Sequence, residues 1–106
     1  MSYGLMGADM QPQGHLQILL GHLDFGLTIQ ETASMPRWRH TGGKVYLEYG
    51  TPPETVQALR AMGHDVKLGN APLGGYGGAQ IVMIDPATGS FLGASDPRKD
   101  GAAIGY

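Results

Sequence analysis

The stretch Gly4-Leu5-Met6-Gly7-Ala8-Asp9-Met10-Gln11-Pro12-Gln13-Gly14-His15-Leu16-Gln17 predicts a small-residue loop that runs into a helix. Asp9 suits the N-cap of that helix. Pro12 suits its first turn, where a missing N–H costs nothing because that donor would be unpaired anyway. Leucines at positions 16, 19, 20 and 23 recur at helical spacing and predict one apolar stripe along the helix.

The same stretch contains a candidate anion-binding turn. Gly7 and Ala8 carry almost no side chain, so their backbone N–H groups can come close to a bound atom. N–H groups at a helix start favour negative charge, including the charge that develops on a carbonyl oxygen during acyl transfer. On these residues alone, a tight glycine-rich entry into an ordinary packed helix is the simpler interpretation.

The composition is that of one folded domain. The chain has 106 residues, of which 42% are hydrophobic and 15% charged, which argues against disorder. A net charge of −2 with scattered basic residues indicates no nucleic-acid partner and no membrane surface. There is no cysteine, which excludes disulfides, thiolate catalysis and cysteine metal sites. The sequence shows neither a membrane-spanning run nor a signal pattern, and it leaves the compartment open.

Two helices are predicted first. The first spans residues 10–25 and ends at Gly26, a residue suited to a left-handed C-cap. A capping box, Thr28 with Glu31, opens a second, short helix that must end before Pro36. The two helices are expected to form a hairpin through their apolar faces.

Strands predominate after the helices. Residues 45–49 and 64–68 are typical of strands, and a second capping box at residues 51–54 opens a helix between them. Residues 69–78 hold five glycines and predict a loop that could border a site. The resulting fold class is α/β, in the sense of a layered α+β arrangement.

The C-terminal third predicts a hairpin. Residues 79–85 are apolar on both faces, which predicts a strand buried on both sides, and residues 90–94 pair back with it. The tail from Ser95 onward is polar and glycine-rich and is expected to lie on the surface. Within it, Asp96-Pro97-Arg98 predicts a tight corner with a structural role.

The chain offers no convincing nucleophile with a base. No Gly-x-Ser-x-Gly elbow is present. His15 and His22 share a helix face but lie two turns, about 10 Å, apart, which is too far for one metal ion. We therefore expect both histidines to be solvated or hydrogen-bonded beside the apolar stripe. The run Gly74–Gly78 lacks the Gly-Lys-Ser/Thr ending of a phosphate loop.

Several stretches together resemble the γ-glutamyltranspeptidase family over essentially the whole chain. They are the opening loop and glutamine-rich helix, Asp24-Phe25-Gly26-Leu27-Thr28-Ile29-Gln30-Glu31, Met35-Pro36-Arg37-Trp38, Val45-Tyr46-Leu47-Glu48, Ala61-Met62-Gly63-His64-Asp65-Val66, Gly93-Ala94-Ser95-Asp96-Pro97-Arg98 and Gly105-Tyr106. The most specific of them is the Gly-Ala-Ser-Asp-Pro-Arg stretch.

The resemblance implies an N-terminal-nucleophile hydrolase with a four-layer αββα sandwich, made as a precursor that cuts itself into a large and a small subunit. The nucleophile is then the N-terminal threonine of the small subunit, with its own amine as base. Residues 1–106 would form a single domain, the C-terminal portion of that small subunit. The nucleophile and the residues that grip the substrate would lie outside this chain. Its partners would be the remainder of the small subunit and the large subunit.

The resemblance also assigns a role to two residues. The family's oxyanion-hole Gly-Gly pair falls on Gly7 and Ala8. The alanine keeps its backbone N–H, and it would cost about 1–2 kcal/mol if the position needs a positive φ. No metal or organic cofactor is implied, and the chain alone is expected to be inactive.

The implied activity is cleavage of γ-glutamyl amides of the glutathione type, with transfer of the acyl group to water or to an amine. Residues 9–15 depart from the pattern of the best-known glutathione-cleaving members, which leaves the substrate open but not the acyl-transfer chemistry. Two alternatives to this interpretation remain. One is an acylase of the same family that acts on other amides, such as β-lactam side chains or poly-γ-glutamate. The other is a non-catalytic module that binds a partner. A fragment of a layered fold would expose an apolar face, so we expect the isolated chain to self-associate.

Overall fold

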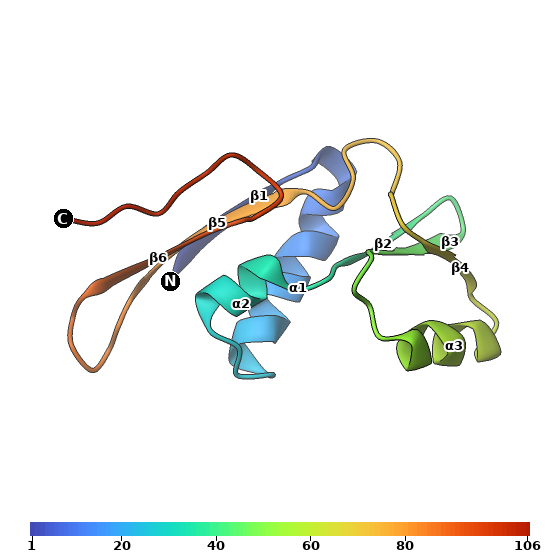
Figure 1. Cartoon of the computed structure of the whole chain (residues 1–106), viewed down its shortest axis with the longest axis horizontal. Helices are drawn as coiled ribbons and strands as arrows, with labels where there is room; N and C mark the ends of the chain where they lie inside the picture. Colours follow the sequence, from blue (N-terminus) through green and yellow to red (C-terminus); the bar gives the residue numbers. More distant parts are fainter.

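The computed structural model describes residues 1–106 as two three-stranded sheets that lie side by side, each with its own helices (Figure 1). The first lobe combines the antiparallel sheet β1-β5-β6 with α1 and α2, and the second combines the mixed sheet β2-β3-β4 with α3. The molecule measures 47 × 25 × 20 Å. No helix is long and apolar enough to cross a membrane. The elements are β1 (Ser2–Met6), the 3₁₀ turn η1 (Ala8–Met10), α1 (Gln11–Leu23), α2 (Ile29–Ser34), β2 (Trp38–Thr41), β3 (Lys44–Leu47), α3 (Pro53–Ala61), β4 (Asp65–Leu68), β5 (Gly78–Ile84) and β6 (Phe91–Ser95).

The main core lies between the first sheet and its helices. The hairpin of β5 and β6 forms as predicted, and β1 pairs with the other edge of β5, with Met6 opposite Gly78. Strand β1 itself was not expected, because the sequence predicted a loop there. The buried core residues are Leu5, Met10, Ile18, Ile29, Ala33, Ala79, Ile81 and Ala94.

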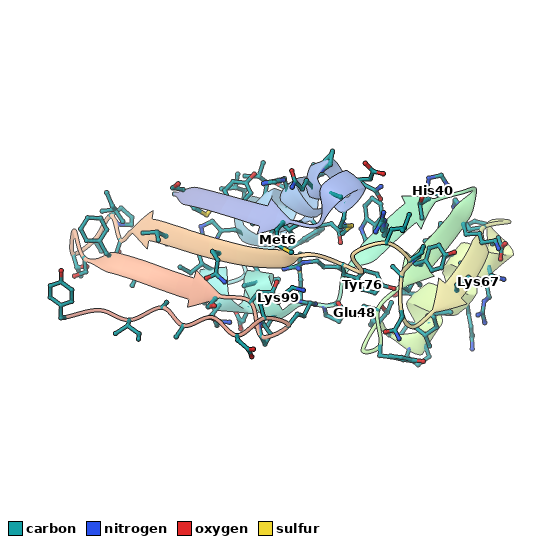
Figure 2. The ribbon with its side chains drawn as sticks, turned by 90° about the horizontal axis from the view of Figure 1, so that it is seen from above. Met6, His40, Glu48, Lys67, Tyr76 and Lys99 are labelled. Atoms are coloured by element: carbon teal, nitrogen blue, oxygen red, sulfur yellow. The ribbon has the colours of Figure 1, made fainter.

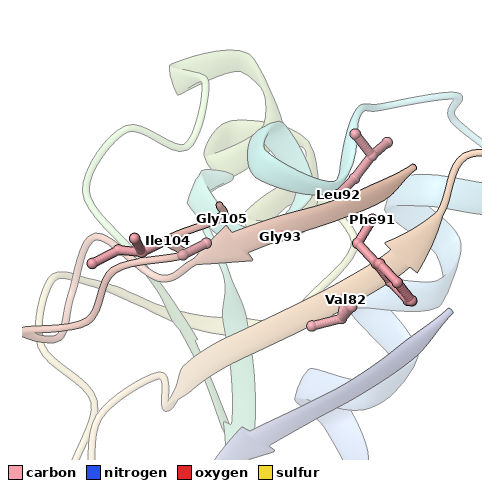
Figure 3. A pocket seen from close by; sticks show the side chains of 7 residues that line it. Val82, Phe91, Leu92, Gly93, Ile104 and Gly105 are labelled. Carbon is pink, nitrogen blue, oxygen red and sulfur yellow. The ribbon is translucent and has the colours of Figure 1, made fainter.

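The opposite side of this sheet, which we call the outer face, is largely bare. It carries Val82, Ile84 and Phe91, which are 50%, 57% and 77% exposed. The prediction that β5 is buried on both sides is therefore wrong for this chain, because α1 and α2 cover one face only. The C-terminal segment runs beside β6, where Ile104 and Gly105 border a shallow hollow of about 260 Å³ (Figure 3).

Helix α1 packs through a face that contains two glycines, and its leucines lie mostly off that face. Leu16 and Leu23 are 48% and 68% exposed, so the predicted apolar stripe is wrong. The buried positions are Gly14, Gln17, Ile18 and Gly21. A Cβ on Gly14 would lie 2.7 Å from the methyl groups of Leu5, so only glycine lets the helix come this close to β1.

The helix starts agree with the sequence in part. The capping box of α2 is present: the Glu31 N–H donates to Thr28 Oγ1 at 3.2 Å, and the Thr28 N–H to Glu31 Oε2 at 2.8 Å. Asp9, in contrast, lies in η1 and caps nothing; the N-cap of α1 is Met10. The second predicted box fails as well, because Pro52 is the N-cap of α3 and the Thr51 hydroxyl donates to the Glu48 carbonyl instead. The strand–helix–strand unit itself is confirmed, with β3 and β4 parallel.

Two glutamines of α1 pair with the free edge of β2. The Gln17 side chain accepts from the Trp38 N–H at 3.0 Å and donates to the Trp38 carbonyl at 2.8 Å. Gln13 does the same with His40, at 2.7 and 2.9 Å. Helix residues four apart rise about 6 Å, close to the 6.6 Å between strand residues two apart, so the two amides match the strand's spacing. This pairing fastens the second lobe to the first.

Buried charges also join the lobes, at the junction seen near Glu48 in Figure 2. Arg37, just before β2, pairs with Asp96, just after β6, at 2.7 Å, and both side chains are fully buried. Arg98 makes a two-point contact with Glu48 at 2.7 and 2.5 Å and also reaches Asp96 at 3.0 Å. The predicted structural corner is confirmed, and the prediction of a surface tail is wrong at Asp96.

Burial acts to raise the pKa of the Asp96 carboxyl, but the N–H groups of Ala79 and Arg98, together with Arg37, outweigh it and hold that pKa below its usual value. The Ala79 N–H donates to Asp96 Oδ2 at 2.8 Å and the Arg98 N–H to Oδ1 at 2.9 Å. The pKa of Arg37 is lowered, mainly by burial and then by Arg98. Asp96 is therefore a buried anion held by donors from several segments.

Candidate oxyanion site

Gly7 and Ala8 lie where β1 turns into η1. Both have positive φ, 143° for Gly7 and 49° for Ala8. Their carbonyls are used, because the Met10 N–H donates to the Gly7 carbonyl at 3.0 Å and the Gln11 N–H donates to the Ala8 carbonyl. The hydrogen bonds of the turns, loops and caps include none donated by the N–H of either residue. Two consecutive N–H groups at this turn, that of the buried Gly7 and that of the exposed Ala8, therefore have no partner among those bonds.

The two positions differ in what they tolerate. A Cβ on Gly7 would lie 3.1 Å from the Gly77 Cα and 3.2 Å from the Met10 Cβ, at a φ that side chains rarely adopt. Ala8 has the left-handed φ of 49°, which costs an L-residue about 1–2 kcal/mol. Residues in sparsely populated backbone conformations cluster at active sites and ligand clamps, so the strain at Ala8 favours a functional role for this turn.

A second segment, residues 69–77 between β4 and β5, lies against this turn; we call it the glycine loop. A Cβ on Gly77 would collide with the Met6 carbonyl, and a Cβ on Gly74 would lie 3.7 Å from the Gly7 carbonyl oxygen. Figure 2 shows Tyr76 at the junction of the lobes, beyond Met6. The expectation that the glycine run borders the candidate site is in keeping with this geometry.

The glycine loop is tied down by buried side chains. The Tyr76 hydroxyl donates to the Gly69 carbonyl, and Arg37 donates to the Tyr76 carbonyl at 3.1 Å. Burial, followed by the charge of Glu48, raises the pKa of Tyr76 to about 12, so the hydroxyl keeps its proton. Arg39, on β2, donates to three further carbonyls of the loop. Arg39 was given no role from the sequence, although its alternation with Trp38 after Arg37 places both arginines on one side of the strand.

The histidines are hydrogen-bonded, as predicted. His15 Nε2 accepts from the Leu5 N–H at 3.2 Å, and its Nδ1–H donates to the Gln11 carbonyl at 2.6 Å. These two bonds brace β1 two residues before Gly7. His22 bonds the Leu27 carbonyl through Nδ1 at 2.8 Å.

The site holds donors without an activated nucleophile. No hydrogen bond joins a serine or threonine hydroxyl to a histidine, and no three His, Asp or Glu side chains gather where they could hold a metal ion. What the geometry offers is a pair of backbone N–H groups on a rigid turn, an arrangement suited to stabilising negative charge on an oxygen.

The fold is that of the N-terminal-nucleophile hydrolases. The chain superimposes on the crystal structure of cephalosporin acylase from Bacillus halodurans with a TM-score of 0.85 and 39% sequence identity, covering 98% of this chain and 20% of that one. The model of the Gamma-glutamyltranspeptidase family matches residues 1–106. The chain therefore belongs to the γ-glutamyltranspeptidase family.

Two curated relatives are similar over almost the whole chain. The Oxamate amidohydrolase proenzyme of Klebsiella pneumoniae is 35% identical over 112 residues, which cover 100% of this chain and 21% of the relative. The Glutathione hydrolase-like YwrD proenzyme of Bacillus subtilis is 35% identical over 113 residues, covering 97% and 21%. The chain thus spans about one fifth of the length of these relatives.

Proposed function

We propose that the chain is the C-terminal portion of the small subunit of a γ-glutamyltranspeptidase-like amidohydrolase, in which the N–H groups of Gly7 and Ala8 form the oxyanion hole. The observation that carries the proposal is the pair of consecutive N–H groups at the β1–η1 turn that no loop, turn or cap of the chain uses. The place within the small subunit rests on the resemblance of Gly93–Arg98 to the family's most specific stretch.

The reaction is acyl transfer through a threonine outside this chain. The N-terminal threonine attacks the amide carbonyl while its own amine takes the hydroxyl proton. The carbonyl oxygen becomes an oxyanion, which accepts hydrogen bonds from Gly7 and Ala8. Loss of one such donor costs about 2.7–4 kcal/mol in comparable sites. Collapse of the intermediate expels the amine and leaves an acyl-enzyme, which water or an acceptor amine then cleaves.

The first substrate candidate is a γ-glutamyl amide of the glutathione type. The family itself and the similarity to a glutathione hydrolase-like protein support it. The second candidate is another amide, and it is favoured by a specific observation: the similarity to a cephalosporin acylase and to an oxamate amidohydrolase is at least as high, at 39% and 35% identity.

The outer face supports the proposed partners. Val82, Ile84 and Phe91 form an apolar surface that monomeric proteins seldom leave uncovered. Both curated relatives are proenzymes about five times as long as this chain, so ample chain exists to cover it. The remainder of the small subunit and the large subunit are the proposed cover. Because the proposed nucleophile lies outside it, the chain alone should turn over no amide.

The test uses the full-length precursor on a denaturing gel, with chromophore release from a γ-glutamyl anilide and ammonia release from oxamate as assays. Two self-cleaved pieces with anilide cleavage support the first candidate. Two pieces with cleavage of oxamate or of a cephalosporin side chain, and none of the anilide, support the second. A single uncut, inactive piece contradicts the proposal and favours the non-catalytic module.

The oxyanion role has its own test in the same precursor. Gly7→Ala should lower kcat by about 10²–10³-fold with little change in KM, because the added Cβ meets Gly77 and displaces the donors. Gly4→Ala is the matched control: it lies three residues earlier in β1, and a Cβ there meets nothing within 4 Å. Equal activity of the two variants would contradict the assignment.

A further inference from the structure

Arg39 is a buried cation without a carboxylate partner. It is 2% exposed, and the ion pairs of the chain involve Arg37, Arg98 and Lys67 but not Arg39. Its Nε is buried and has no hydrogen-bond partner. A buried guanidinium that is not paired with an acid is costly, so its retention calls for a specific task.

The side-chain hydrogen bonds of Arg39 all go to the glycine loop. Its Nη1 group donates to the carbonyls of Pro72 at 2.7 Å, Leu73 at 2.9 Å and Gly75 at 3.2 Å. Within residues 69–77 the only internal backbone hydrogen bond is that from the Gly77 N–H to the Gly74 carbonyl, at 3.4 Å. Arg39 therefore replaces the backbone pairing that this loop lacks.

The loop that Arg39 holds is under strain and would not keep its shape unaided. Leu73 has a φ of 46°, which is uncommon for a branched side chain, and it is 83% exposed. No packing of its own side chain can hold it there. Arg39 makes its two shortest hydrogen bonds to the carbonyls on either side of this strained position, those of Pro72 and Leu73.

The held loop in turn backs the candidate oxyanion turn. Gly74 approaches the Gly7 carbonyl, and the Cα of Gly77 fills the space that a side chain on Gly7 would take. Arg39 thus acts on Gly7 in two steps: its side chain bonds the loop carbonyls, and Gly74 and Gly77 of that loop pack close to Gly7. A shift of the loop by a few tenths of an ångström would therefore be passed to the Gly7 and Ala8 N–H groups, whose alignment decides their effect on an oxyanion.

We propose that Arg39 is a positioning residue that sets the geometry of the Gly7–Ala8 turn through the glycine loop. This proposal rests on the proposed oxyanion role for its kinetic consequence. Its structural half, that Arg39 holds both segments in place, can be measured whether or not that role is correct.

The structural half is tested by amide hydrogen exchange of the full-length precursor. Arg39→Met should speed exchange at least tenfold in two segments, residues 4–10 and 69–78, and leave β4 and α3 unchanged. Arg39→Lys should restore part of the protection, because an ammonium group can still donate to carbonyls. Arg60→Met on α3 is the matched control, since Arg60 makes only one long bond, of 3.5 Å, to Val66. Unchanged exchange at residues 4–10 in Arg39→Met would overturn the proposal.

The kinetic half uses the self-cleaved enzyme with whichever of γ-glutamyl anilide or oxamate it cleaves. We expect Arg39→Met to lower kcat by 10–100-fold with KM changed less than threefold, and Arg39→Lys to recover at least a third of that loss on a logarithmic scale. If Arg39→Met only reduces the amount of folded enzyme, the fraction of active sites falls while kcat per active site stays at the wild-type value. That result would overturn the proposal. A wild type that stays uncut and cleaves neither the anilide, nor oxamate, nor a cephalosporin side chain would refute the proposed function, and hydrogen exchange would still decide the role of Arg39.

Discussion

Replacing Asp96 with asparagine removes the negative charge at the junction of the two lobes and keeps the shape of the side chain. The carboxylate accepts from four donors: the guanidinium groups of Arg37 and Arg98 and the backbone N–H groups of Ala79 and Arg98. Each of its two oxygens therefore accepts from two donors, Oδ2 from Arg37 and Ala79 and Oδ1 from the side chain and backbone of Arg98. An asparagine amide must turn its NH₂ group toward one of these sides, where it faces N–H donors and cannot accept.

The magnitude follows from burial. The Arg37 and Asp96 side chains are both 0% exposed, so water cannot replace the lost partner. Breaking one member of such a buried pair costs about 3–5 kcal/mol, against a total stability of about 5–15 kcal/mol for a domain. With a urea m-value of about 2 kcal/mol/M, the unfolding midpoint of Asp96→Asn should fall by about 2 M.

The assay is urea unfolding of the chain, followed by circular dichroism, with Asp65→Asn as the matched control. Asp65 pairs with Lys67 at 2.9 Å, but the two side chains are 49% and 50% exposed, so its loss should barely move the midpoint. Equal midpoints for the two variants would refute the argument that burial makes the Arg37–Asp96 pair strong.

Acid should erase the difference between the wild type and Asp96→Asn. The pKa of Asp96 is lowered in the folded chain, so its contribution is present above the unfolded value of about 3.9 and is lost as pH falls through the folded pKa. The gap between the two unfolding midpoints should therefore be constant near pH 6 and narrow below about pH 4. A gap that widens in acid would contradict the sign of this shift.

Three further predictions concern other parts of the molecule. Ala8→Gly should stabilise the chain by about 0.5–1 kcal/mol in urea unfolding, because relief of the positive φ outweighs the added freedom of the unfolded chain; destabilisation would show that the turn carries no strain. Gln17→Leu should lower the free energy of unfolding by about 2–4 kcal/mol, because it leaves the N–H and carbonyl of Trp38 unpaired. The same change at the exposed Gln57 should have little effect, and equal effects would refute the edge-pairing role of Gln17. The isolated chain should self-associate in sedimentation experiments, and Val82→Lys on the outer face should shift it toward monomer; a wild type that stays monomeric at all concentrations would count against this expectation.

Features that depend on residues close in sequence could be predicted. The Thr28–Glu31 capping box, the end of α2 before Pro36 and the β5–β6 hairpin all formed, because the partners lie within a few positions of each other. The contacts of Arg39 could not be predicted, because its loop lies more than thirty residues further along the chain. Nothing in the residue type says which distant carbonyls it will find.

The buried face of helix α1 was predicted wrongly for a different reason. Its leucines have the right spacing for a buried stripe, but the helix lies against β1 through Gly14, which approaches Leu5 too closely for any side chain. Spacing alone cannot tell which of two possible faces packs, since close approach of two backbones can outweigh the larger apolar surface. Gln17 is buried and Gln13 half-buried, and both find backbone partners on β2, so their polarity did not predict their exposure.

The apolar pattern of β5 predicts more cover than this chain supplies. Its two-sided character predicts cover on both faces, and the helices of this chain supply cover on one. Because the apolar residues on the uncovered face of β5 would otherwise meet water, the pattern favours cover by another chain. The exposed Val82 and Ile84 therefore support the proposal that the remaining subunit chain completes the layers. The Gly7–Ala8 turn lies at the end of β1, the strand paired with β5, so the proposed covering chain would lie against the same sheet that carries the proposed oxyanion donors.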